Sequence, residues 1–432
     1  MTTKRVALHT LGCKVNQYEA DAFLNIFLQN GYEAVDFADQ ADVYLIHTCT
    51  VTHLGDRKSR QLIRRAVKNN PDALIVVSGC YAQVAPEEVA KIPGVDLIVG
   101  TQDRGKILEL LEEAKRKKEP INAVRDIMHT HDFEELSRQH TGKERAFLKI
   151  EEGCQQFCSY CIIPFARGPV RSREPQRTIQ EVQQLVSQGY KEIVLTGIHT
   201  GAYGQDLGSP YNLNWLIIEL SKTPGLKRLR LSSLDPNEFT EDFIETLAAN
   251  PIICPHLHIS LQSGDDDVLR RMNRRYTTTA FAKLVFKLRQ KIADLALTTD
   301  IMVGFPGETA KQHENSLHFV EEMGFAALHV FKYSPRQGTK AAQFPDRISP
   351  EIKEKRSQEM LCLGEKLAVQ FKQKYLGRKM EILVETKHKR LWEGHTTNYL
   401  KLKFPSDEEL RGELVQVSLE QICSDYILGK LV

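Results

Sequence analysis

The sequence predicts an α/β protein in three parts: an N-terminal α/β domain on a parallel sheet, a central partial (β/α)6 barrel, and a small C-terminal all-β domain. Three observations support this. Apolar strands alternate with amphipathic helices over residues 1–125, and six further strand–helix units follow over 140–370. From residue 371 onward, short segments alternate in hydrophobicity with turn residues between them, which is typical of a small barrel of oligonucleotide-binding (OB-like) type.

The first series of elements predicts βαβ units, because a helix that carries the chain back between two strands makes those strands parallel. Strands are expected at 5–11, 42–48, 73–79 and 95–99, and helices at 17–29, 57–68, 86–91 and 106–117. The charged and weakly periodic residues 116–145 predict a linker.

The second series predicts an open or partial barrel, since six units are too few for a closed barrel of eight. The expected strands are 147–151, 192–195, 228–231, 257–261, 297–303 and 327–333, with helices that include 179–188, 240–249 and 309–323. A basic helix over 350–375 leads to three short strands at 381–385, 399–404 and 413–417. Gly394 and Pro405 are interpreted as turn signals among them.

The bulk composition favours a cytoplasmic globular protein. The chain has 432 residues, of which 41% are hydrophobic, and no stretch resembles a secretory signal or a membrane span. Thiols stay reduced in the cytosol, so the nine cysteines indicate metal binding or catalysis rather than disulfides. The net charge of +2 does not indicate a nucleic-acid partner, but basic clusters over 57–68 and 372–403 fit either a polyanion partner or solvated faces.

Three closely spaced cysteines follow the first predicted barrel strand directly. Cys154, Cys158 and Cys161 form a C-x3-C-x2-C run, and such barrels carry their active sites at the carboxyl ends of the strands. Three thiolates can hold three irons of a 4Fe–4S cluster and leave the fourth iron open. Zinc is the alternative, but structural zinc needs four ligands and no obvious fourth Cys or His completes the site.

Three dispersed cysteines share a position in the N-terminal fold. Cys13, Cys49 and Cys80 each follow a predicted strand of the parallel sheet. Such strands end at one edge, where parallel sheets bind their ligands, and Gly12 and Gly79 would allow close approach of a bulky group. This placement predicts a second three-cysteine cluster, with three separate buried cysteines as the alternative. The remaining cysteines, Cys254, Cys362 and Cys423, show no such pattern and are interpreted as structural.

The C-x3-C-x2-C run, with Tyr160 at the aromatic position before its last cysteine, resembles the radical S-adenosylmethionine superfamily. Joined to Cys13, Cys49 and Cys80, it resembles the methylthiotransferases over essentially the whole chain. The flanking sequences Leu11-Gly-Cys-Lys-Val-Asn16 and His47-Thr-Cys-Thr-Val-Thr52 are similar to the branch that acts on tRNA N6-threonylcarbamoyladenosine.

The resemblance implies three domains: an N-terminal methylthiotransferase domain over 1–125, a radical S-adenosylmethionine core over 140–370, and an RNA-binding TRAM domain over 371–432. It also implies two 4Fe–4S clusters with separate tasks. The compact set would bind and cleave S-adenosylmethionine to make a 5′-deoxyadenosyl radical, and the dispersed set would present the methylated sulfur. The expected reaction adds a methylthio group to C2 of N6-threonylcarbamoyladenosine beside the anticodon.

Further contacts follow from the resemblance. Tyr160, Gly197, Gln262 and Asp300 are expected to contact S-adenosylmethionine, with barrel loops or strand-end caps as the alternative. A further expectation concerns three arginines after the compact set, which would meet RNA phosphate or be solvated: Arg167, Arg171 and Arg173. The expected partners are the tRNA anticodon stem-loop and an electron donor such as flavodoxin or ferredoxin.

Alternative functions remain open from the sequence. The same chemistry could act on N6-isopentenyladenosine in tRNA or on a ribosomal protein. A function of another class is a non-catalytic, metal-containing RNA-binding protein, although six cysteines in two open three-ligand sets argue against a purely structural metal.

Overall fold

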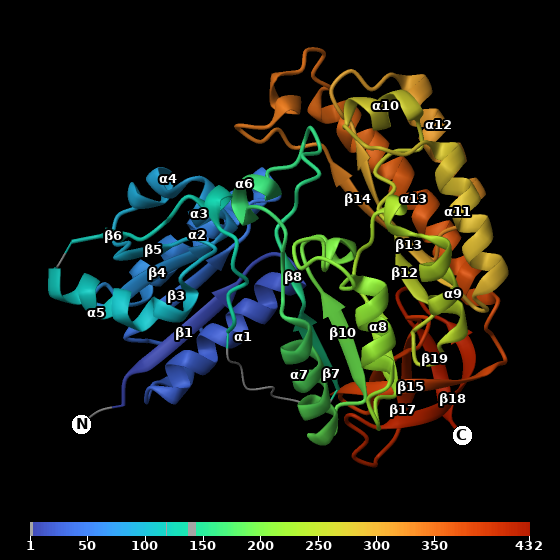
Figure 1. Cartoon of the computed structure of the whole chain (residues 1–432), viewed down its shortest axis with the longest axis horizontal. Coiled ribbons are helices and arrows are strands. Elements are labelled where there is room, and N and C mark those ends of the chain that lie inside the picture. The colour runs from blue at the N-terminus through green and yellow to red at the C-terminus, as the bar shows by residue number, and fades with distance from the viewer. Residues whose placement is uncertain (1–2, 118, 137–143) are drawn as a thin grey trace. The chain divides into compact units, whose positions relative to one another are not determined.

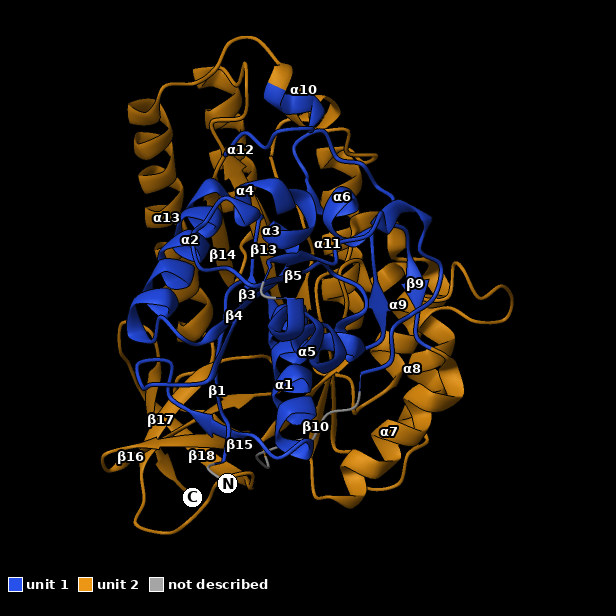
Figure 2. Cartoon of the chain, turned by 90° about the vertical axis from the view of Figure 1, so that its left-hand side faces the viewer, with its two compact units in different colours: residues 1–140, 149–173, 334–342 blue, residues 141–148, 174–333, 343–432 orange. Residues whose placement is uncertain are grey.

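The computed structural model describes residues 3–117, 119–136 and 144–432. The chain divides into two compact units (Figure 2). Unit 1 contains Met1–His140, Lys149–Arg173 and Ser334–Ala342, and unit 2 contains Thr141–Leu148, Glu174–Tyr333 and Gln343–Val432. The predicted domain bounds, 1–125, 140–370 and 371–432, stay a prediction. Within the predicted linker, residues 118 and 137–143 lie outside the described residues.

Unit 1 is built on a six-stranded parallel sheet with the order β2-β1-β3-β4-β5-β6 (Figure 1). Its strands are β1 (Arg5–Thr10), β2 (Glu33–Val35), β3 (Val43–Thr48), β4 (Leu74–Gly79), β5 (Leu97–Val99) and β6 (Ile121–Asn122). The predicted parallel sheet is confirmed. The sequence did not reveal β2 and β6, because edge strands of three and two residues are too short to show an apolar pattern.

Helices bury both faces of this sheet. They are α1 (Lys14–Gln29), α2 (His53–Asn69), α3 (Cys80–Val84), α4 (Pro86–Ala90) and α5 (Ile107–Lys117). Leu45 of β3 lies in one apolar cluster with Phe23 of α1, whereas its neighbour Ile46 lies in the opposite cluster with Ile63 of α2. Because both faces are covered, the strand is a continuous apolar run rather than an alternating one.

Unit 2 contains the six predicted barrel strands. They are β7 (Arg145–Lys149, whose last residue belongs to unit 1), β10 (Glu192–Thr196), β11 (Arg228–Leu231), β12 (His256–His258), β13 (Ala296–Val303) and β14 (Ala327–Lys332). They form two three-stranded sheets, β11-β10-β7 and β12-β13-β14, and parallel bridges from Leu229 to Ile253 and from Leu234 to Ile259 connect the sheets. The partial barrel of six strands is therefore confirmed.

The helices of unit 2 follow its strands along the chain. They are α7 (Pro175–Ser187), α8 (Leu213–Ser221), α9 (Glu241–Ala249), α10 (Asp266–Arg271), α11 (Thr278–Lys291), α12 (Ala310–Met323) and α13 (Pro350–Gln373). Local sequence fixes their ends. Helix α12 begins with a capping box of Thr309 and Gln312 and ends at Gly324, which takes the left-handed conformation with φ of 57°.

The C-terminal part of unit 2 is a closed five-stranded barrel in the order β15-β16-β17-β19-β18. The strands are β15 (Lys379–His388), β16 (Leu391–Thr396), β17 (Lys401–Pro405), β18 (Leu414–Ile422) and β19 (Ile427–Leu431). The predicted OB-like barrel is confirmed, but the turn expected at Gly394 is wrong. Gly394 lies inside β16, where a Cβ atom would stand 2.2 Å from the Leu383 carbonyl oxygen, so close strand packing rather than a turn requires glycine.

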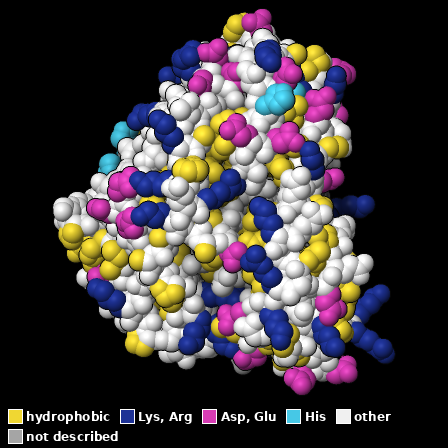
Figure 3. All heavy atoms as spheres, turned by 90° about the vertical axis from the view of Figure 1, so that its right-hand side faces the viewer, with side chains coloured by type: hydrophobic (Ala, Val, Ile, Leu, Met, Phe, Trp, Pro, Cys, Tyr) yellow, Lys and Arg dark blue, Asp and Glu magenta, His cyan; other side chains and the backbone are white. Residues whose placement is uncertain are grey.

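No helix in the described ranges is long and apolar enough to cross a membrane. Figure 3 shows basic and acidic side chains interspersed over one face of the molecule. This distribution agrees with the small net charge of +2.

Candidate metal centres

The three dispersed cysteines lie at the carboxyl ends of three adjacent strands in unit 1. Cys13 follows β1 and is the N-cap residue of α1, Cys49 follows β3, and Cys80 follows β4 as the first residue of α3. Burial raises the pKa of the Cys80 thiol to about 12, and the neighbouring Cys49 and Cys13 thiols add to that rise. The three thiols are thus close enough to interact electrostatically. Cys13 is exposed, Cys49 is partly buried and Cys80 is buried.

Two glycines let the backbone approach this set closely. Gly12 has a φ of 110°, and a Cβ atom on it would lie 2.9 Å from the Cβ atom of Cys49. Gly79 has a φ of 97°, and its Cβ atom would lie 2.6 Å from the Thr48 carbonyl oxygen. Only glycine satisfies both the positive φ and the short distance at these positions.

Arg167 lies beside the dispersed set although it follows the compact set in the sequence. Its Nε donates to the Cys80 Sγ atom over 3.2 Å, and its Nη2 donates over 2.6 Å to Asn16, which in turn donates to the carbonyl oxygens of Leu11 and Thr48. A guanidinium beside a sulfur stabilises negative charge on that sulfur. The arrangement therefore suits a cysteine that serves as a thiolate ligand.

Arg167 belongs to a buried network of charges. Its Nη1 lies 2.6 Å from Glu19 and 2.5 Å from Glu152, and Lys149 donates to the same two carboxylates over 3.0 and 2.7 Å. Arg104 also pairs with both. Burial alone would raise the pKa of Glu19, but the surrounding cations hold it well below its usual value. The network is therefore charged at neutral pH, as buried ion pairs require.

The expectation that Arg167, Arg171 and Arg173 meet phosphate or solvent is wrong. All three are buried: Arg167 pairs with Glu19 and Glu152, Arg171 donates to the Arg167 carbonyl oxygen, and Arg173 pairs with Glu135 at 2.7 Å. Local sequence could not predict these contacts, because Glu19 lies 148 positions from Arg167 and Glu135 lies 38 positions from Arg173.

The compact set lies in one loop of unit 1, between β8 (Glu151–Glu152) and α6 (Ile163–Arg167). Its backbone is held by local hydrogen bonds. The Cys154 N–H donates to the Gly168 carbonyl oxygen over 3.0 Å, and the Cys161 N–H donates to the Cys158 carbonyl oxygen over 2.9 Å. Gly153 has a φ of 95°, and its Cβ atom would lie 1.8 Å from the Pro169 carbonyl oxygen. The three cysteines are partly exposed.

Both sets fit the donor requirements of an iron–sulfur cluster that keeps one iron open. Each offers three thiols, and each has glycine where backbone must approach closely. In the dispersed set, Arg167 adds a hydrogen bond to a ligand sulfur, which is one of the features that tune such clusters.

A large pocket in unit 1 lies next to residues that follow both sets. Its volume is about 970 Å³, and its lining includes Tyr81, which follows Cys80, and Phe165, four residues after Cys161. Arg60 of α2 and Arg336 also line it. In the sequence, Arg60 was visible only as part of the basic cluster over 57–68. Arg336 was not predicted, because it belongs to no local motif and the fold brings segment 334–342 into unit 1.

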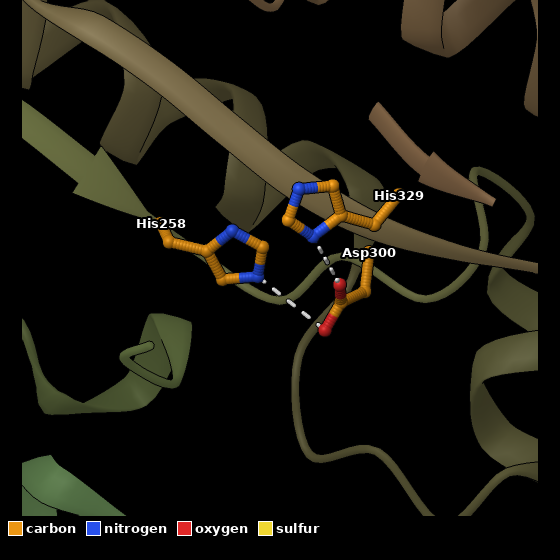
Figure 4. Close-up of side chains that lie close together, drawn as sticks. All are labelled: His258, Asp300 and His329. Atoms are coloured by element: carbon orange, nitrogen blue, oxygen red, sulfur yellow. Dashed lines mark ion pairs between the residues drawn. The ribbon is translucent and has the colours of Figure 1, made fainter. Parts of the chain in front are cut away.

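Asp300 lies in unit 2 between two histidines (Figure 4). One Asp300 carboxylate oxygen lies 3.3 Å from the Nε2 atom of His258, and the other lies 3.4 Å from the Nδ1 atom of His329. Burial alone would raise the pKa of Asp300, but the hydrogen bonds of the two histidines lower it well below its usual value. The carboxylate is therefore held ionised on a barrel strand.

The other expected cofactor contacts occupy loops and strand ends. Gly197 follows β10, and Tyr160 is partly buried in the compact-set loop. Gln262 takes a φ of 66°, and its N–H donates to the Asp300 carbonyl oxygen over 2.8 Å. Their contacts with S-adenosylmethionine stay a prediction, as do the roles of the six cysteines. Of the remaining cysteines, Cys254 is buried, Cys423 partly buried and Cys362 exposed.

Comparison with known proteins supports this organisation. Residues 5–100 match the uncharacterized protein family UPF0004, and residues 148–320 match the radical SAM superfamily. The chain is 46% identical to threonylcarbamoyladenosine tRNA methylthiotransferase MtaB of Bacillus subtilis, over 99% of this chain and 96% of that protein. It is 35% identical to tRNA-2-methylthio-N(6)-dimethylallyladenosine synthase of the same organism, over 99% and 86% of the two chains.

A solved structure shares the fold at low identity. The radical S-adenosylmethionine methyltransferase TsrM of Kitasatospora setae superposes with a TM-score of 0.59 and 16% identity, over 79% of this chain and 77% of that one. This likeness concerns the fold alone. The two family matches, together with 46% identity over nearly the full length of the chain, show that the chain belongs to the methylthiotransferase family of radical S-adenosylmethionine enzymes.

Proposed function

We propose that this protein adds a methylthio group to C2 of N6-threonylcarbamoyladenosine in tRNA. The observation that carries the proposal is the meeting of Cys13, Cys49 and Cys80 at one sheet edge, in a chain that also has a compact radical S-adenosylmethionine motif. A single motif would support radical chemistry of any kind, whereas a second three-thiol set supports sulfur insertion. Full-length similarity at 46% identity to a protein named for this reaction supports the choice of substrate.

The two cysteine sets would hold the two 4Fe–4S clusters. Cys154, Cys158 and Cys161 would hold one, which also binds S-adenosylmethionine. The other would be held by Cys13, Cys49 and Cys80. When bound, these groups would supply the radical chemistry and the sulfur of the reaction. The N-terminal α/β region (1–125), the radical core (140–370) and the TRAM-type barrel (371–432) would form the three functional domains.

The chain's own residues would orient and insulate these groups. Arg167 would fix the Cys80 side of the dispersed set through its hydrogen bond to Sγ, and Glu19 and Glu152 would keep Arg167 in place. In the core, Gly197 and Gln262 would contact the cofactor, and Asp300 would offer it a charged hydrogen-bond acceptor. Tyr160 would pack beside it.

The RNA partner would be the anticodon stem-loop. Its modified adenosine lies in a single-stranded region, and enzymes that act on a base take it out of the stack into a pocket. The C-terminal barrel carries Lys389 and Arg390 at the turn between β15 and β16, and Lys387 near the end of β15. All three are exposed, and none forms an ion pair with the described residues. They would contact phosphate in a salt-dependent manner. A flavodoxin or ferredoxin would supply electrons, and the reaction would take place in the cytoplasm.

Nucleoside mass spectrometry tests the substrate. We expect 2-methylthio-N6-threonylcarbamoyladenosine to disappear from tRNA when the gene is deleted from a host without a second such enzyme, and to return when the gene is restored. Loss of the isopentenyladenosine product instead would move the protein to the other tRNA branch. Unchanged levels of both would contradict a tRNA substrate.

A further inference from the structure

The pocket of unit 1 is large enough for a modified nucleoside. Its volume of about 970 Å³ is near the upper end of the range for small-molecule pockets. Its lining combines exposed apolar side chains, Phe165 and Met128, with charged ones. Phe165 is 41% exposed and Met128 is 36% exposed, and such side chains suit the face of a base.

Arg60 differs from the other two arginines that line this pocket. Arg336 pairs with Asp56 at 2.6 Å, and Arg125 pairs with Asp103 at 2.9 Å. Arg60 forms no ion pair within the part of the chain that the structure describes. Its one hydrogen bond runs from Nη1 to the Tyr81 hydroxyl over 3.0 Å, so its other N–H groups are available to a ligand.

The carboxylates around the pocket are engaged or lie at its surface. Asp56 pairs with Arg336, Glu88 accepts from the Tyr81 hydroxyl over 2.8 Å, and Asp126 accepts from the backbone of Met128. Glu87 is exposed in the first turn of α4. Arg336 is not available in the same way, because its Nη1 and Nη2 atoms donate to Asp56 and Thr50 and its Nε atom is buried. The pocket thus holds a guanidinium, that of Arg60, with no ion-pair partner among the described residues, and it contacts Tyr81, which follows Cys80.

We propose that Arg60 binds the carboxylate of the N6-threonylcarbamoyl group in this pocket and thereby selects that base over N6-isopentenyladenosine. This inference rests on the proposed function. The isopentenyl group is apolar and uncharged, so it would leave Arg60 without a partner. A site built around a polar partner rejects an analogue that lacks it, because its own polar groups then stay unpaired.

The position of Arg60 suits this task. Arg60 contacts Tyr81, the residue that directly follows Cys80 in the chain. The Arg60 guanidinium donates to the Tyr81 hydroxyl and lies 5.8 Å from the centroid of the Tyr81 ring. A carboxylate held by Arg60 would therefore place its adenine near the dispersed cysteine set. Relatives named for the threonylcarbamoyl and for the isopentenyl base both match the chain over 99% of its length, so a local feature rather than the fold must separate the two substrates.

Binding to anticodon stem-loops tests the proposal with the reconstituted holoprotein. Three RNAs are compared: one with N6-threonylcarbamoyladenosine, one with its neutral methyl ester, and one with unmodified adenosine. A charge-assisted hydrogen bond predicts that the wild type binds the acid roughly 10- to 100-fold more tightly than the ester. We expect Arg60→Gln to bind the acid and the ester within about 3-fold of each other, since the partner of the carboxylate is gone.

Two further variants complete the test. Arg116→Gln removes the same charge from an exposed position of α5 that does not line the pocket, and it should discriminate as the wild type does. Arg60→Lys keeps the charge without the planar fork and should discriminate to an intermediate degree. If Arg60→Gln loses its iron, two other measurements still test the proposal. They are the comparison of acid with ester in the wild type and the same comparison in Arg60→Lys.

Three results would overturn the proposal. The wild type could bind the acid and the ester equally, Arg60→Gln could still prefer the acid, or Arg60→Gln could lose affinity equally for all three RNAs. The last would assign Arg60 to a backbone phosphate. Failure of the proposed function is distinguishable, since it would appear as a wild type that binds these RNAs but never methylthiolates the threonylcarbamoyl base.

Discussion

The two cysteine sets of unit 1 are assembled in opposite ways. The compact set comes from eight consecutive positions, Cys154 to Cys161, and backbone hydrogen bonds within the same loop region hold it. The dispersed set requires three strands of a parallel sheet to end at one edge. Its surroundings also differ, because Arg167 and four buried charged residues stand behind Cys80.

The two sets are therefore sensitive to different changes. The compact set depends on local backbone conformation, so changes within its own loop should disrupt it. The dispersed set depends on long-range packing and on buried charges, so changes far from the cysteines in sequence should disrupt it.

Removing the cysteines themselves should have the largest effect. We expect Cys158→Ala to abolish both S-adenosylmethionine cleavage and methylthiolation, because it removes a ligand of the compact set. Cys80→Ala should abolish methylthiolation and spare cleavage. Anaerobic assays of 5′-deoxyadenosine and of the modified nucleoside measure the two steps. Loss of cleavage in Cys80→Ala, with the compact cluster shown intact by its spectrum, would contradict the division of tasks.

Gly153→Ala should disrupt the compact set alone. Its new Cβ atom would lie 1.8 Å from the Pro169 carbonyl oxygen, which is backbone and cannot move away cheaply. We expect the variant to lose about half of its iron, measured after reconstitution, because one of two four-iron clusters is lost. Gly189→Ala is the control, since Gly189 has a similar φ of 96° with no atom within 4 Å of its Cβ position. Equal iron loss in the control would attribute the effect to φ strain.

Arg167→Met should weaken the dispersed set through the buried charges. It leaves Glu19 and Glu152 without one of their cations and removes the hydrogen bond to Cys80. We expect a loss of about 3–5 kcal/mol in the free energy of unfolding. Denaturant unfolding measures it, with Arg270→Met as the control, because Arg270 forms an exposed pair worth about 0–1 kcal/mol. Similar losses in both variants would argue against a special role of the buried network.

Acid should weaken the same network more gradually. The folded protein lowers the pKa of Glu19 well below its usual value of 4.5, so the stability that Glu19 contributes is present above pH 4.5 and is lost as pH falls toward the lower folded pKa. The expected slope is about 1.4 kcal/mol per pH unit for one such group. Unfolding at several pH values should show a smaller slope in Glu19→Gln. An unchanged slope would mean that Glu19 does not titrate in this manner.

Local patterns explain why most elements could be predicted. The six barrel strands and four of the sheet strands lie in apolar stretches that can be seen in the sequence, and the compact cysteines are closely spaced along the chain. The dispersed cysteines could be predicted only because parallel strands end at a common edge. Short elements such as β2 and β6 gave no signal.

Long-range pairing explains what could not be predicted. Arg167 lies 148 positions from Glu19 and 87 from Cys80, so nothing in its neighbourhood indicates that it is buried. A basic residue near a cluster motif suggests phosphate binding until its carboxylate partners are known. Gly394 illustrates the same limit, since a glycine inside a strand and one in a turn look alike in sequence.

The iron content of the reconstituted protein is the sharpest test of whether the two cysteine sets hold two separate clusters. Two 4Fe–4S clusters on two three-cysteine sets predict about eight irons per chain in the wild type. They also predict about four in a variant with Cys13, Cys49 and Cys80 all changed to Ala, with cleavage of S-adenosylmethionine retained. A wild type that holds only about four irons, and that keeps them when Cys13, Cys49 and Cys80 are changed to Ala, would contradict a cluster on the dispersed set.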